Sequence, residues 1–171
     1  MGQYWKVVNL DKREYVDPHR LGCGLKLWEQ LANHPGTGAA LVVLCAAMPE
    51  TRGGGDLALD SDVSKRTIGR WAGNCIALVG DYSELKDLWL RYDADLVYYL
   101  CDTAENIRKF ATHWTLHPWT DDPDEADEYE DKARRLLEAQ PYRDISDDVC
   151  AVIEQELHGQ YQGDGWRKFV T

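Results

Sequence analysis

The sequence has no apolar run of the length that a membrane-spanning helix requires. Its continuous apolar stretch, Ala39 to Met48, is far shorter than the roughly 20 residues that cross a bilayer. The N-terminal residues, MGQYWKVVNLDKREY, carry charges where a secretion signal would be apolar. We therefore expect a cytoplasmic protein with no membrane partner.

Basic residues are also scarce. The 171 residues include 19 Lys and Arg against 30 Asp and Glu, which gives a formal net charge of −11. Phosphate binding needs a field of Lys and Arg, so we expect no direct binding of nucleic acid. Residues 121–131 hold eight acidic and no basic residues, and removing these eight charges from −11 leaves −3. The acidity is therefore one local feature.

Cysteine pairs of the kind that bind zinc or form redox centres are missing. The five cysteines are scattered, odd in number and contain no CxxC spacing. Most of them stand in apolar runs, so we predict reduced core residues and no disulfide framework. They are Cys23, Cys45, Cys75, Cys101 and Cys150.

Recognisable catalytic motifs are absent too. The sequence has no GxSxG, no phosphate-binding lysine loop and no HExxH. His113 and His117 are four residues apart, but Pro118 disfavours helical geometry at His117. We predict no metal site and no cofactor. Catalysis stays open because active sites assemble from residues that are remote in sequence.

The residues that are present indicate a mixed fold. Tyr4 to Val16 reads as a β-hairpin around a polar turn, and Ile68 to Tyr82 reads as a second hairpin around Ala72-Gly73-Asn74. The apolar runs 39–48 and 96–101 suit either a buried strand or a helix, and Val42-Val43 favours a central strand in the first.

Apolar residues recur at helical spacing in five further segments. We predict an α+β fold in one globular domain over residues 1–171: an antiparallel sheet from the N-terminal half, packed by several amphipathic helices from the C-terminal half. The hydrophobic fraction of 44% is enough for such a core. The helices are expected at about 25–36, 83–92, 103–114, 122–140 and 146–157.

The acidic run belongs to the helix at 122–140. Asp122 can cap this helix, Pro123 suits its first position, and carboxylates in its first half complement the helix macrodipole. Eight carboxylates in eleven positions exceed what capping requires. We therefore predict that this helix docks on a basic partner surface through Asp124, Asp127 and Glu128.

An alternative site combines a glycine-rich loop at 51–62, expected to be mobile, with the polar ends of the 68–82 segment. Such residue types could supply an acid/base pair and an anion clamp for a small-molecule or enzymatic site. The candidate residues are His19, Asp56, Arg70, Asp81 and Tyr82.

Several blocks resemble a widespread set of microbial proteins that begin MGQYY or MGQYW. The shared blocks cover about the first half of the chain and one later segment, while residues 95–140 do not fit the pattern. The resemblance implies a family but no activity and no catalytic residues. The blocks are GQYWKVVNLDKREY, Gly22 to Trp28, RGGGD, RWAG with IALVGDY, and YRDISDD.

Together these observations favour an interaction protein over an enzyme. A small, acidic, aromatic-rich chain without a catalytic motif is typical of inhibitors and toxin-immunity proteins, which act by occupying a partner. A subunit of a larger assembly would share these features, and the small-molecule site remains the alternative.

Overall fold

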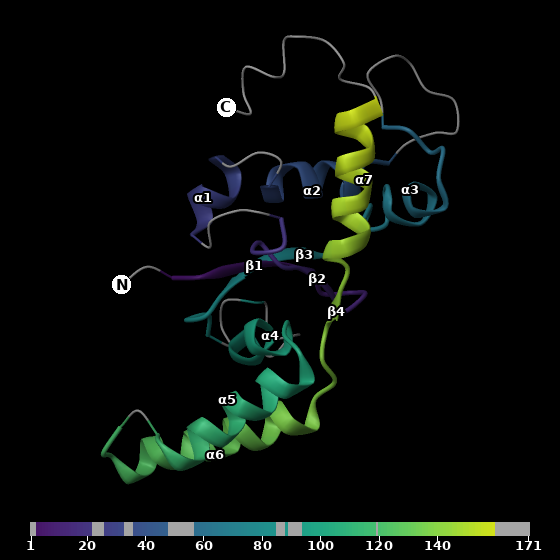
Figure 1. The fold of residues 1–171 in the computed structure, drawn as a ribbon. Coiled ribbons are helices and arrows are strands. Elements are labelled where there is room, and N and C mark those ends of the chain that lie inside the picture. Colours follow the sequence, from purple (N-terminus) through teal and green to yellow (C-terminus); the bar gives the residue numbers. More distant parts are fainter. Residues whose placement is uncertain are drawn as a thin grey trace.

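The computed structural model describes residues 3–21, 26–32, 36–47, 57–84, 88, 94–118 and 120–159. These residues form four strands and seven helices (Figure 1). The strands are β1 (Trp5–Asn9), β2 (Glu14–Val16), β3 (Ile76–Gly80) and β4 (Arg143–Asp144). The helices are α1 (Leu27–Ala32), α2 (Gly36–Cys45), α3 (Asp62–Thr67), α4 (Ala94–Leu100), α5 (Ala104–Leu116), α6 (Pro123–Glu138) and α7 (Ser146–Gly159).

The four strands make one mixed sheet in the order β3-β1-β2-β4. Strand β1 pairs antiparallel with β2 and β3, while the short β4 pairs parallel with β2. The predicted N-terminal hairpin is confirmed, and Arg13 completes its turn with a φ of 52°. The fold is α+β, as predicted.

Helices cover both faces of the sheet. Side chains alternate across a strand, so Val7 and Val16 enter one core while Val8 and Tyr15 enter the other. In Figure 1, α1, α2, α3 and α7 lie on one side, and α4, α5 and α6 lie on the opposite side. None of the helices in these described ranges is long and apolar enough to cross a membrane.

The predicted hairpin at 68–82 is wrong. Helix α3 ends at Thr67, a series of turns follows, and β3 pairs with β1 instead of with residues 68–71. The backbone N–H groups of Gly69 and Trp71 donate to the carbonyl oxygens of Val43 and Leu44, each over 2.8 Å. The turns therefore satisfy the open end of α2, and Trp71 is fully buried beside it.

Residues 39–45 of the apolar run 39–48 are helical, so the strand prediction there is wrong as well. Ala40, Val43 and Leu44 are buried at the i, i+3, i+4 spacing of a helix, whereas Val42 is 62% exposed. Because every residue of the run is apolar, the sequence pattern does not show which side of the helix is buried. The second ambiguous run, 96–101, lies mostly in α4.

The remaining helices follow the predicted pattern with local differences. Helices α5 and α6 are capped by Thr103 and Asp122, whereas α1 is shorter than predicted. Ser146 is the first residue of α7, and its hydroxyl donates to the Asp144 carboxylate and accepts the N–H of Asp17. Most of the predicted helix at 83–92, residues 51–56 of the predicted loop and the tail from 160 onward lie outside the described residues.

The cysteines only partly match their prediction. Cys101 is buried and Cys150 is half-buried, but Cys45 and Cys75 are exposed, so the core assignment is wrong for these two. All four carry free thiols. Cys23 lies outside the described residues.

Candidate functional site

Helix α6 presents a strongly acidic face. The Asp122 side chain accepts the N–H of Asp124 over 3.0 Å, and Pro123 starts the first turn, so the helix forms where the sequence predicted it. Ala133 and Leu136 face α5 and bury the opposite side of the helix. The predicted docking residues Asp124, Asp127 and Glu128 are all exposed.

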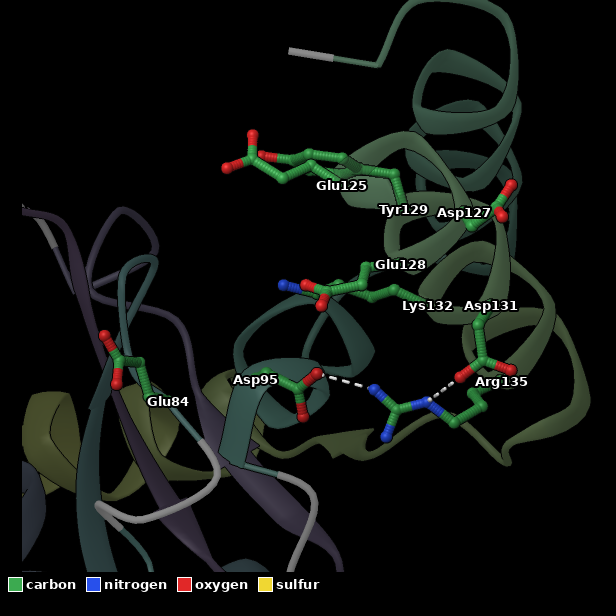
Figure 2. A pocket seen from close by; sticks show the side chains of 9 residues that line it. All are labelled: Glu84, Asp95, Glu125, Asp127, Glu128, Tyr129, Asp131, Lys132 and Arg135. Atoms are coloured by element: carbon green, nitrogen blue, oxygen red, sulfur yellow. Dashed lines mark hydrogen bonds and ion pairs between the residues drawn. The ribbon is translucent and has the colours of Figure 1, made fainter. Parts of the chain in front are cut away.

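A groove with a volume of about 960 Å³ runs beside this face. It lies between α6, the first turn of α4 and the segment after β3 (Figure 2). We call it the acidic groove, because carboxylates outnumber cations among its lining residues. These residues are Glu84, Asp95, Glu125, Asp127, Glu128, Tyr129, Asp131, Lys132 and Arg135.

One of the two cations in the acidic groove is held by carboxylates of the chain. The Arg135 guanidinium lies 2.6 Å from the Asp95 carboxylate of α4 and 3.3 Å from Asp131 of its own helix. Figure 2 shows Arg135 between these two acids. The Asp95 side chain is only 14% exposed, so this ion pair fixes α6 against α4 at the base of the groove.

Lys132, the other cation, is bound differently. Its ammonium lies 4.9 Å from the centroid of the Trp114 ring and 5.3 Å from that of Tyr99. Burial lowers the pKa of Lys132, and the nearby Asp95 carboxylate opposes this shift. In the described part of the chain, the ammonium makes no hydrogen bond and no ion pair.

The predicted small-molecule site does not assemble around Arg70. Both nitrogens of its guanidinium fork bind the Glu14 carboxylate, and the Trp71 indole N–H donates to the same carboxylate over 3.0 Å. We call Glu14, Arg70 and Trp71 the Glu14 cluster. Burial alone would raise the pKa of Glu14, but the hydrogen bonds from Arg70 and Trp71 outweigh it and lower that pKa.

The other predicted ligand residues lie apart from the Glu14 cluster. Asp81 follows the opposite end of β3, where its carboxylate accepts the N–H of Tyr4 over 3.1 Å. Five strand residues separate the two ends, a length of about 16 Å. Tyr82 is 61% exposed, His19 lies in the exposed turn after β2, and Asp56 lies outside the described residues.

The two spaced histidines lie at the end of α5. His117 has left helical geometry, with a φ of −141°, as Pro118 predicts, and its ring centroid is 5.6 Å from that of His113. Both rings line a shallow hollow of about 430 Å³ with Arg108 and Lys109. Among the described residues, no three His, Cys, Asp or Glu side chains converge in a way that could hold a metal ion.

Sequence reasoning missed the other wall of the acidic groove. Asp95 is forty positions from Arg135 and Glu84 is about as far from the centre of α6, so no local pattern joins them. The charge count did predict the acidic face of α6, because the carboxylates of that face lie close together in the sequence.

Comparison of the chain with family models, with curated proteins and with solved structures found no match in any of the three. The family resemblance of the N-terminal blocks therefore stays a prediction. The fold and site define an α+β protein with one acidic helical face.

Proposed function

We propose that this chain is a small interaction protein that binds a basic surface of a protein partner through the acidic face of α6. The observation that carries the proposal is that Asp124, Asp127 and Glu128 are exposed and have no ion pair within the described part of the chain. Carboxylates left unpaired on a folded surface create a negative potential that steers and orients a cationic partner.

The acidic groove extends this surface. The side chains of Glu125 and Glu128 point from α6 toward the acidic groove (Figure 2). A partner can therefore contact both the acidic face of α6 and the groove. In this proposal the chain acts by occupying its partner, as inhibitors and immunity proteins do.

We further propose that this binding takes place in the cytoplasm and does not involve nucleic acid. The free thiols of the four described cysteines support a reducing compartment. The net charge of −11 would repel a polyanion. A partner with a basic surface is attracted by the same charge.

The alternative small-molecule site has less support. Its anion clamp depended on Arg70, whose guanidinium is already bound by Glu14. Arg70 could bind an anionic ligand only if its ion pair with Glu14 were broken. This ion pair is largely buried, so breaking it is costly. A subunit role in a larger assembly would use the same acidic face and would give a permanent complex in place of a reversible one.

The test is capture of a partner by the tagged protein from its host at low and moderate salt. Reversing Asp124, Asp127 and Glu128 together to Lys should abolish capture. It should hardly move the thermal midpoint, because lost helix-dipole interactions and relieved carboxylate repulsion oppose each other.

A matched control separates the α6 face from the net charge. Reversing Glu29, Asp62 and Glu154, which are exposed on α1, α3 and α7, changes the net charge equally. This variant should keep the partner. Loss of capture in both variants, or in neither, would contradict docking through α6.

A further inference from the structure

Two aromatic rings form a corner against the ammonium of Lys132, a residue that lines the acidic groove. Tyr99 of α4 and Trp114 of α5 have centroids 4.7 Å apart and planes inclined at 84°. The Lys132 ammonium of α6 lies within about 5 Å of both rings. The chain therefore already places an ammonium group against this aromatic corner.

Among the described residues, the ammonium of Lys132 contacts these rings and makes no hydrogen bond or ion pair, and Lys6 shows the contrast. Lys6 also lies over two rings, those of Tyr15 and Tyr98, but its ammonium donates to the carbonyl oxygen of Cys101 and pairs with Asp102. Lys6 is thereby fixed at the C-terminal end of α4. Among the described residues, no hydrogen bond or ion pair holds the Lys132 ammonium in the same way.

A primary ammonium is a poor occupant of this corner. It is compact and strongly hydrated, so burial penalises its charge, which is why the pKa of Lys132 is lowered. A quaternary ammonium is weakly hydrated and is the cation that aromatic cages recognise best. The carboxylates of Glu125 and Glu128 stand at the same groove and would attract such a cation.

We propose that Tyr99 and Trp114, together with the carboxylates of the acidic groove, bind a quaternary ammonium group that replaces the Lys132 side chain. Tyr129 lines the acidic groove and lies partly buried against the same core as the two rings. The site needs no protein partner, so it goes beyond the docking function. When no such ligand is bound, the Lys132 side chain occupies the site.

The test is a calorimetric titration with tetramethylammonium chloride against sodium chloride at equal ionic strength. Lys132→Ala should bind tetramethylammonium at least tenfold more tightly than the wild type, because the cation no longer has to displace the lysine. Lys109→Ala removes the same charge from the exposed face of α5, where Lys109 pairs with Glu105, and should match the wild type. Equal affinity in Lys132→Ala and the wild type would overturn the proposal.

Further variants and probes make the test specific. Lys132→Met keeps a side chain of similar length over the rings and should bind tetramethylammonium less tightly than Lys132→Ala does.

Butylammonium, a primary ammonium, should bind Lys132→Ala more weakly than tetramethylammonium does, and the reverse order would contradict the aromatic site. Choline and trimethyllysine then distinguish a free small molecule from a modified side chain as the source of the group. Because these titrations contain no partner, their failure is distinct from a failure of capture.

Discussion

In the Glu14 cluster every charged group meets a partner from the chain, whereas the acidic groove holds carboxylates that the described residues leave unpaired. Glu14 is 4% exposed and receives hydrogen bonds from Arg70 and Trp71. Glu125 and Glu128 are exposed and make no ion pair in the described ranges. The charges of the first region form contacts within the fold, whereas Glu125 and Glu128 in the second region have no ion pair among the described residues and can contact a ligand.

The two regions also differ in what they connect. The Glu14 cluster joins β2 to the turns after α3, and Lys12 adds a hydrogen bond from its ammonium to the carbonyl oxygen of Arg70. The acidic groove lies beside the contact between α6 and α4, where Arg135 pairs with Asp95 and Lys132 lies over the Tyr99 ring. Substitutions in the first region should therefore affect stability, and substitutions in the second should affect binding.

Glu14→Ala is expected to have the largest effect on stability. It leaves the guanidinium of Arg70 and the buried indole N–H of Trp71 without their acceptor, which should cost about 3 to 5 kcal/mol in the free energy of unfolding. Urea denaturation at pH 7 measures this loss. Glu105→Ala breaks the exposed pair with Lys109 and should cost less than about 1 kcal/mol. Similar losses in both variants would mean that Glu14 stabilises the fold no more than a residue of an exposed ion pair does.

The pH dependence of stability should sharpen the same distinction. The pKa of Glu14 is lowered in the folded state, so below about pH 4.3 the unfolded chain takes up a proton that the folded chain does not. The stabilisation from Glu14 is therefore complete above that pH and decreases as the pH falls through the folded-state pKa. Urea midpoints of the wild type and Glu14→Gln should converge as the pH falls below about 4.3. A gap that stays constant with pH would show that ionised Glu14 contributes nothing.

Local signals account for the parts of the fold that the sequence predicted. The N-terminal hairpin has a polar turn that ends at Arg13, and α5 and α6 each begin at a capping side chain, Thr103 and Asp122. These features depend on residues a few positions apart. The acidic docking face could be predicted for the same reason, since it belongs to a single helix.

Contacts between distant segments account for the failures. The turns at Gly69 and Trp71 are specified by the end of α2, more than twenty positions earlier, and not by a hairpin partner. The aromatic corner brings together Tyr99, Trp114 and Lys132 from three helices. Helical spacing predicts that Trp114 is a core residue. It does not predict the contact with Lys132, because that residue belongs to another helix.

Lys132→Met should have the smallest effect on stability. The substitution removes two cation–π contacts but also the cost of burying an ammonium, so the free energy of unfolding should change by less than about 0.5 kcal/mol. Lys6→Met is the matched control, because it removes the hydrogen bond to the Cys101 carbonyl oxygen and the ion pair with Asp102. It should cost about 1 to 3 kcal/mol. Equal losses in urea denaturation would mean that Lys132 is as much a part of the fold as Lys6, and that the aromatic corner is closed to a ligand.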